Sequence, residues 1–303
     1  MEPVKLKSDL KEYIWAGEKL VKNYGKDYGP SKVAESWELS FNASGPSLID
    51  SGKDAGKCLK DVATKEDIGT LASGFEFFPV LIKLIDSDSK LSVQVHPSDE
   101  YALKNEGQFG KTEMWHVLEA KEGAGLYVGW KRKTNKEEVE AALKDGSIMS
   151  LLNFVEVHPG DDFFIESGTV HAIGEGVTLI EIQENSTLTY RLYDYDRVGK
   201  DGKKRELHIE KALKVLSYEP YKKPAFEKPL IGRSKYFSSS VHYLNGMIDI
   251  EASKESFKAL TFVSGEGVFN KIPFKKGDSF FIPASKKAHI EGVGDYILTE
   301  VTK

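Results

Sequence analysis

Alternation of apolar and polar residues is the main signal along this chain, and it predicts a protein built largely from short β-strands. In residues 91–96, LSVQVH, apolar positions alternate with Ser92, Gln94 and His96. Because successive side chains of a strand point to opposite faces, one face packs in a core and the other presents polar groups. Runs rich in β-branched and aromatic residues predict further strands at 77–85, 114–120, 125–130, 154–157, 162–166 and 177–183.

Two segments have helical spacing instead. Residues 134–153 open with Thr134, a residue type that caps helices, and Glu137 three positions later completes the pattern of a capping box. Residues 206–216 carry apolar residues at helical intervals. Residues 218–229 contain three prolines, which predicts a crossover segment between two halves of the chain.

The two halves share a repeated unit. The stretch PGDDFFIESGTVH, whose first glycine is Gly160, aligns with KGDSFFIPASKKAH, whose glycine is Gly277. A repeat of this kind predicts that one strand–turn–strand unit was duplicated. The spacing from Gly160 through Gly168 to His171 resembles the second motif of the cupin superfamily. This resemblance implies a mainly β fold, a double cupin of two jelly-roll β-barrels with a small helical insertion near 134–153.

The second copy departs from the motif. Ser285 stands in place of the second glycine, and His289 comes one position late, which would turn its side chain to the other face of a strand. We therefore expect residues 1–220 to form an N-terminal metal-binding cupin domain. Residues 221–303 are expected to form a C-terminal, degenerate cupin domain without a metal.

Composition narrows the class of protein. The chain has 303 residues and a formal net charge of -5, which argues against a general nucleic-acid binder. No apolar run approaches the ~18 residues of a membrane span, and the N-terminus lacks the apolar core of a signal peptide. We therefore expect a cytoplasmic protein without nucleic-acid or membrane partners. Cys58 is the only cysteine, so a metal site would need His, carboxylate and amide ligands.

Four residues could form such a site. Gln94 and His96 lie two positions apart on one strand face, about 7 Å from each other along the backbone. His171 follows a glycine at a strand–turn junction, and Glu113 stands at the entrance of another strand. Together they could bind zinc or a similar divalent ion and leave one coordination position open. The alternative is that each is an ordinary polar residue of a strand.

These residues and their flanks resemble the type I mannose-6-phosphate isomerases, in particular their short, bacterial-type branch. The resemblance extends from IWAGEKL near the start to PFKKGDSFFIPA near the end. It implies that one Zn²⁺ ion per chain is bound by Gln94, His96, Glu113 and His171. The segments that carry it are PVLIKLIDSDSKLSVQVHPSDEYA, GKTEMWHVL, SGTVHAIGEG and LIEIQENSTLTYRLYDYDR.

The activity implied by the resemblance is interconversion of mannose 6-phosphate and fructose 6-phosphate through a cis-enediol intermediate. Such a reaction needs a general base that moves a proton between C1 and C2. We expect Glu181, on the apolar strand VTLIEIQ, to be that base, with a pKa raised by its surroundings. The alternative is a strand glutamate that faces solvent.

Cationic and hydroxyl side chains near the ligands are candidates for binding a sugar phosphate. The resemblance makes Arg191 a catalytic residue that would hold the phosphate or steady the intermediate; otherwise it would pair with Asp194 or Asp196. Lys83, Ser92 and Lys111 could contact the hydroxyls or the phosphate, and Lys111 is also a candidate catalytic residue. We expect a monomer or a homodimer. The alternatives are a cupin isomerase for another sugar or sugar phosphate, and a non-catalytic cupin that binds a sugar or a metal.

Overall fold

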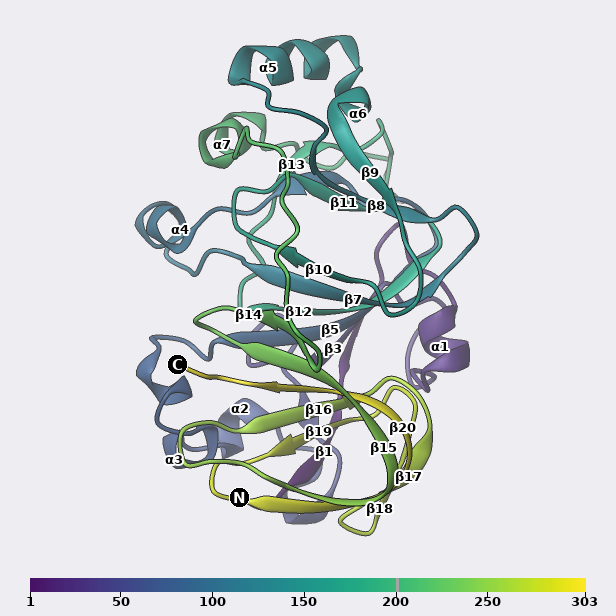
Figure 1. The fold of residues 1–303 in the computed structure, drawn as a ribbon, viewed down its shortest axis with the longest axis vertical. Helices are drawn as coiled ribbons and strands as arrows, with labels where there is room; N and C mark the ends of the chain where they lie inside the picture. The colour runs from purple at the N-terminus through teal and green to yellow at the C-terminus, as the bar shows by residue number, and fades with distance from the viewer. Residues whose placement is uncertain (200–201) are drawn as a thin grey trace.

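The fold consists of two β-structures stacked along the long axis of the molecule, as seen in a computed structural model (Figure 1). The structure describes residues 1–199 and 202–303. Strands from the first two thirds of the chain form the upper part in this view, and both termini lie in the lower part. Among the described residues, no helix is long and apolar enough to cross a membrane.

Two antiparallel sheets form the upper barrel. The first has six strands in the order β10-β7-β12-β5-β3-β2, and the second has five in the order β13-β6-β11-β8-β9. Apolar side chains such as Trp115 and Val128 pack into one buried cluster with others from both sheets. The strands are β2 (Asp9–Lys11), β3 (Glu35–Leu39), β5 (Val80–Ser87), β6 (Val93–Val95), β7 (Glu113–Ala120), β8 (Gly125–Trp130), β9 (Leu152–Glu156), β10 (Asp162–Ile165), β11 (His171–Ile173), β12 (Val177–Glu184) and β13 (Tyr190–Tyr193).

One curled sheet forms the lower barrel. Its main path is β14-β15-β20-β16-β19-β1-β4, and β17 pairs with both β18 and β20. Aromatic side chains, among them Phe262, Phe269 and Phe280, fill its core. The strands are β1 (Val4–Lys7), β4 (Leu48–Ile49), β14 (Leu230–Arg233), β15 (Ser238–Glu251), β16 (Lys258–Phe262), β17 (Glu266–Phe269), β18 (Ile272–Lys275), β19 (Ser279–Ile282) and β20 (Lys287–Glu300).

The lower sheet includes two strands from the beginning of the chain. Val4 of β1 pairs with Phe281 of β19, and β4 pairs with the other edge of β1. A division of the chain at residue 220 therefore does not divide its sheets, because residues 4–7 and 48–49 complete the second barrel. A buried cluster that includes Leu39, Val80 and Phe281 joins the two barrels.

The repeated unit appears once in each barrel, so the predicted double-cupin fold is confirmed. Gly160 and Gly277 have φ angles of +93° and +92°, a backbone region that residues with a side chain rarely adopt. Each precedes an equivalent strand, β10 or β19. Gly168 has φ +87°, and Ser285 in its place also has a positive φ, +61°. His289 is exposed and contacts Asp249, so the one-residue offset points it away from the second barrel's core.

The helices are short, and the longest differs from its prediction. Helix α5 begins at Lys136, and its cap is Asn135, whose side chain accepts from the N–H of Glu138; Thr134 was therefore the wrong cap. The left-handed Gly146 ends α5, so the predicted helix 134–153 becomes two helices and the start of β9. The helices are α1 (Lys19–Asn23), α2 (Leu59–Val62), α3 (Lys65–Ile68), α4 (Asp99–Glu106), α5 (Lys136–Asp145), α6 (Ile148–Leu151) and α7 (Ile209–Val215).

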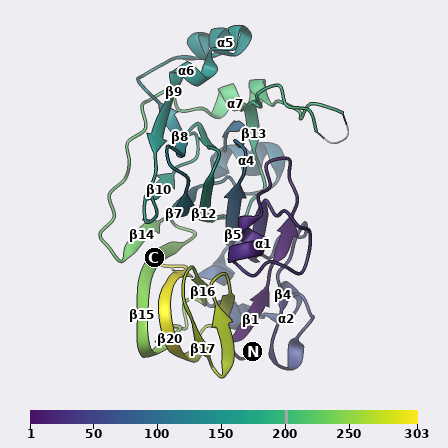
Figure 2. The ribbon, with the colours of Figure 1, turned by 90° about the vertical axis from the view of Figure 1, so that its right-hand side faces the viewer.

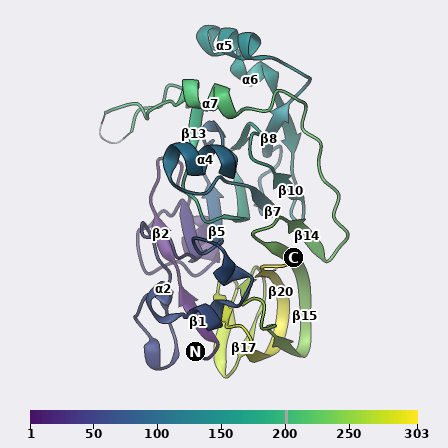
Figure 3. The same cartoon turned by 90° about the vertical axis from the view of Figure 1, so that its left-hand side faces the viewer.

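The predicted crossover links the barrels. Residues 218–229 contain no helix or strand and run along the side of the upper barrel from α7 to β14 (Figures 2 and 3).

Candidate metal centre and substrate pocket

The candidate site lies inside the upper barrel, where a row of side chains on each sheet faces the other. On the five-stranded sheet, Arg191 of β13 lies opposite Gln94 of β6, which lies opposite His171 of β11. Residues directly opposite each other in an antiparallel sheet point to the same face. The alternation of side chains along each strand thus determines which residues face the barrel interior. The register between neighbouring strands then places these residues side by side in one row.

The six-stranded sheet supplies the second row. Glu181 of β12 lies opposite both Trp115 of β7 and Lys83 of β5, and Lys83 lies opposite Trp37 of β3. Between the rows is a pocket of about 370 Å³. Its lining includes Lys83, Ser92, Gln94, Lys111, Glu181 and Arg191, together with Trp15 and Trp37.

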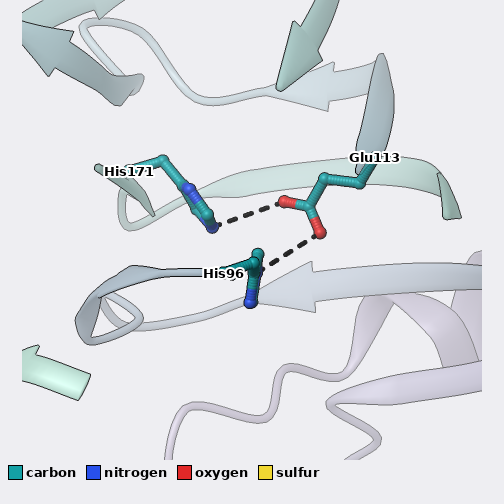
Figure 4. Close-up of side chains that lie close together, drawn as sticks. All are labelled: His96, Glu113 and His171. Atoms are coloured by element: carbon teal, nitrogen blue, oxygen red, sulfur yellow. Dashed lines mark ion pairs between the residues drawn. The ribbon is translucent and has the colours of Figure 1, made fainter. Parts of the chain in front are cut away.

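Three of the four predicted metal ligands converge in the barrel interior (Figure 4). Ligand atoms of His96, Glu113 and His171 all lie within 4.8 Å of one another, and the three side chains are buried. Glu113 is the first residue of β7, His171 is the first of β11, and His96 directly follows β6. The Glu113 carboxylate oxygens lie 3.4 Å from Nε2 of His171 and 3.6 Å from Nε2 of His96.

Backbone contacts orient both imidazoles toward this centre. Nδ1 of His96 lies 2.8 Å from the carbonyl oxygen of Leu188, and Nδ1 of His171 lies 2.9 Å from that of Thr169. A carbonyl only accepts hydrogen bonds, so each Nδ1 carries the proton and each Nε2 presents a lone pair. Such second contacts are what hold a metal-ligating histidine in the required tautomer.

Burial shifts the pKa values of His96, His171 and Glu113. Burial and the nearby Lys111 ammonium hold the pKa of His96 well below its usual value, and burial lowers the pKa of His171 to about 4. Both imidazoles are therefore neutral near pH 7, as metal ligands must be. Burial and the charge of Glu181 raise the pKa of Glu113 to about 7. Glu113 Oε1 is buried without a hydrogen-bond partner, so a cation beside it would favour its ionised form.

The fourth predicted ligand and Lys111 connect the cluster to the pocket. The amide nitrogen of Gln94 lies 3.2 Å from Nε2 of His171, and an amide turned by 180° would present its oxygen there instead. The Lys111 ammonium contacts the Glu113 carboxylate and lies 3.4 Å from Nε2 of His96. Because Gln94 and Lys111 also line the pocket, the cluster lies at the pocket floor.

Glu181 is buried beside two ammonium groups, so the expectation of a raised pKa was wrong. Its Oε1 lies 3.0 Å from Nζ of Lys83 and 3.4 Å from Nζ of Lys111. Burial alone would raise the pKa of Glu181, but the two lysines and a hydrogen bond from Trp115 lower it to about 2. The carboxylate faces the pocket rather than solvent, and it is ionised at neutral pH.

Arg191 makes neither of the ion pairs considered from the sequence. Asp194 pairs with Arg197 and Arg205, while Asp196 pairs with Lys204. Nη1 of Arg191 donates to the carbonyl oxygen of Glu206 at 3.2 Å, and its buried Nε has no hydrogen-bond partner. Among the described residues, no carboxylate forms an ion pair with this guanidinium.

Several residues in or next to the pocket were missed from the sequence. Trp115 donates from Nε1 to Oε2 of Glu181 at 3.1 Å, and Glu35 lies 3.4 Å from Nζ of Lys83. Trp115 could have been found, because it stands two positions after Glu113 on the same strand face. Arg205 and His208 also line the pocket, but they come from outside the strands and carry no periodic signal.

Comparison with known proteins agrees with this geometry. Residues 4–117 match the catalytic domain of type I phosphomannose isomerases, and residues 228–301 match the mannose-6-phosphate isomerase cupin domain. The chain is 34% identical to the mannose-6-phosphate isomerase ManA of Bacillus subtilis over 99% of each chain. It is 36% identical over 98% of each chain to GmuF of the same organism, described as a probable mannose-6-phosphate isomerase.

A solved structure gives the same result for the whole fold. The crystal structure of a mannose 6-phosphate isomerase from Bacillus subtilis matches with a TM-score of 0.88 and 33% identity, and the match covers 99% of each chain. The two proteins thus share more than 30% of their residues over their full length and have the same arrangement of both barrels. The chain therefore belongs to the type I phosphomannose isomerase family.

Proposed function

We propose that this protein is a zinc-dependent aldose–ketose isomerase that interconverts mannose 6-phosphate and fructose 6-phosphate. One observation carries the proposal: a cluster with the donor chemistry of a divalent-ion site lies at the floor of a pocket that also holds Glu181 and Arg191. The relatives named as mannose-6-phosphate isomerases support this choice of substrate. A simple metal store would need the ligands but not the opposing row of charged side chains.

The residues present fit a divalent metal. Two neutral imidazoles turn their Nε2 lone pairs inward, and the buried Glu113 Oε1 lacks a hydrogen-bond partner. Gln94, His96, Glu113 and His171 would hold the ion, and nitrogen and oxygen ligands of this kind suit Zn²⁺. When bound, the ion supplies a Lewis acid that polarises sugar oxygens.

The proton transfer falls to Glu181 in this proposal. Its carboxylate would accept the proton from C2 of the aldose and return it to C1, while a second proton passes from the O2 hydroxyl to O1, which gives the ketose through a cis-enediol intermediate. Lys83 and Lys111 keep it ionised, and the Trp115 hydrogen bond fixes one oxygen. The same two ammonium groups would lie beside the reacting oxygens, where they could stabilise developing negative charge.

The direct test is turnover of mannose 6-phosphate to fructose 6-phosphate by the purified protein, with metal content measured in parallel. We expect activity to disappear on treatment with a chelator and to return with one equivalent of zinc per chain. Chelation without effect on turnover would exclude metal dependence. Absence of turnover by protein that carries a full metal equivalent would favour another sugar or a binding role. The monomeric or homodimeric state and a cytoplasmic location remain predictions.

A further inference from the structure

Lys111 stands on a loop, residues 107–112, that links α4 to β7 and contains no helix or strand. Its ammonium nevertheless has a defined place: it contacts the Glu113 carboxylate and lies 3.4 Å from both Glu181 Oε1 and His96 Nε2. A lysine side chain is flexible, so the position of its ammonium depends on how firmly the backbone below it is held.

The segment that directly follows His96 holds one side of this loop. The N–H of Gly110 donates to Oδ1 of Asp99 at 2.8 Å. The N–H of Lys111 donates to the carbonyl oxygen of Pro97 at 3.1 Å. A Cβ atom at position 110 would lie 2.5 Å from that carbonyl oxygen, so only glycine allows the two segments to approach this closely. The backbone of Lys111 is thereby tied to the segment after His96.

Glu184 and Ser186 hold the loop from the other side. The N–H of Thr112 donates to Oε1 of Glu184 at 2.8 Å, and Oγ of Ser186 donates to the carbonyl oxygen of Phe109 at 2.9 Å. Both of these side chains are buried. Every residue from 109 to 112 therefore has a backbone hydrogen bond to a neighbouring segment. Such bonds are costly to break where water cannot replace them.

The second barrel reaches this loop through Tyr236, in the turn between β14 and β15. The Tyr236 hydroxyl donates to Oδ2 of Asp99, the oxygen that is not bound to the loop. The buried Tyr236 ring packs on the ring of Phe109, with 5.3 Å between their centroids. Nζ of the exposed Lys235 lies 2.8 Å from the same carboxylate oxygen. One carboxylate thus joins the second barrel to the backbone beside Lys111.

We propose that Asp99 is a positioning residue for Lys111, and that Tyr236 of the second barrel acts on the reaction through Asp99. Neither Asp99 nor Tyr236 is among the described residues that line the pocket. The inference rests on the proposed function, in which the Lys111 ammonium stabilises negative charge on the sugar oxygens. Stabilisation of this kind requires donors that are in place before the reaction, so a displacement of about 1 Å can cost about 10²-fold in rate.

Tyr236→Phe and Asp99→Ala test the two links, and Tyr24→Phe is the matched control. Tyr24 is also buried, and its hydroxyl donates to a carboxylate, that of Glu119, at 3.0 Å. Glu119 stands six positions after Glu113 on β7, about 20 Å away along the strand. The control therefore removes the same kind of hydrogen bond at a distance from the site.

Each variant is assayed with mannose 6-phosphate at saturating zinc, and its bound zinc is measured. Asp99→Ala should lower kcat by about 10- to 100-fold and leave KM within about 3-fold, because a misplaced ammonium loses an interaction of the transition state. Asp99→Asn keeps an acceptor for Gly110 and should recover most of this loss. Tyr236→Phe should lower kcat by about 3- to 10-fold, since Asp99 keeps its bond to Gly110. Tyr24→Phe should change kcat by less than about 2-fold.

A second measurement adds Asp99→Ala to Lys111→Met. If Asp99 acts through Lys111, this addition should lower kcat by less than about 2-fold. Equal losses of kcat with and without Lys111 would overturn the inference, as would an unchanged kcat in Asp99→Ala or in Tyr236→Phe. Loss of bound zinc in Asp99→Ala would also overturn it, because Asp99 would then hold the metal ligands rather than Lys111.

Failure of the proposed function looks different. In that case wild-type protein loaded with zinc would not turn over mannose 6-phosphate at all. Circular dichroism identifies a loss caused by misfolding. If Asp99→Ala does not fold, Tyr236→Phe, which keeps the packed ring, repeats the comparison with and without Lys111→Met and is judged by the same outcomes.

Discussion

Glu184 offers a sharp test of how burial shapes the electrostatics next to the site. It is the last residue of β12 and is only 3% exposed. Oε1 accepts a hydrogen bond from the N–H of Thr112 at 2.8 Å, while the buried Oε2 has no hydrogen-bond partner. Burial and the nearby charge of Asp99 raise the pKa of Glu184 from 4.5 to about 8. Glu184→Gln replaces the protonated carboxyl by a neutral group of the same shape.

The sign of the effect follows from proton linkage. As pH rises past 4.5 the unfolded chain releases the Glu184 proton, whereas the folded chain keeps it until about pH 8. Between these values the unfolded state binds fewer protons, so the stability of the wild type falls as pH rises. One pKa unit corresponds to about 1.4 kcal/mol, so the full difference is on the order of 5 kcal/mol. Glu184→Gln should therefore become more stable than wild type progressively from pH 4.5 to 8, with a plateau above.

Urea unfolding at pH 5, 6, 7, 8 and 9 with saturating zinc measures this difference directly. Glu119→Gln is the control of opposite sign, because Lys276, Tyr24 and Lys19 lower the pKa of Glu119 despite its partial burial. Its carboxylate stabilises the fold above its unfolded pKa, so that variant should be less stable than wild type at neutral pH. A free-energy difference between Glu184→Gln and wild type that stays constant across the range would refute the reasoning.

Two further predictions concern the candidate base and the junction of the barrels. Glu181→Gln should lower kcat by about 10²- to 10⁴-fold with zinc content unchanged, because an amide cannot accept the proton; near-full turnover at normal zinc content would exclude Glu181 as the base. Lys26→Met should lower the free energy of unfolding by about 3–5 kcal/mol, because it leaves the buried Glu38 carboxylate without its ammonium partner at 2.9 Å. The exposed pair of Lys22 and Glu18 provides the control, and Lys22→Met should cost no more than about 1 kcal/mol in the same urea titration. Similar small losses in the two lysine variants would contradict the assigned role of burial.

The local pattern correctly predicted the strand that carries Gln94 and ends just before His96. Side-chain alternation in residues 91–96 places Gln94 and His96 on one face whatever the rest of the chain does, because the period of a strand is two. The cupin-like spacing likewise located His171, since Gly160 and Gly168 adopt positive φ angles that glycine allows without strain. These features depend only on residues a few positions apart in the chain, so they can be predicted directly from the sequence.

The same pattern failed where partners come from distant segments. The pKa of Glu181 was expected to be raised, but register across β5, β12 and β7 brings Lys83 and Trp115 beside it. Strands β1 and β4 join the second barrel although they belong to the first 50 residues. Neither the neighbours of Glu181 nor the pairing of β1 and β4 can be read from sequence periodicity, because the order of strands in a sheet depends on which strand edges pair.

The sequence by itself determined the strand-rich fold, the types of side chain at the candidate metal site and the family. What only the tertiary structure decided was the electrostatic character of the pocket. Lys111 lies against Glu113 of the candidate metal centre, and Lys83 lies 3.0 Å from the Glu181 carboxylate. The physical reason is distance: Coulomb energies and pKa values depend on separations of a few ångströms and on burial, and both are set only when the two sheets close into a barrel.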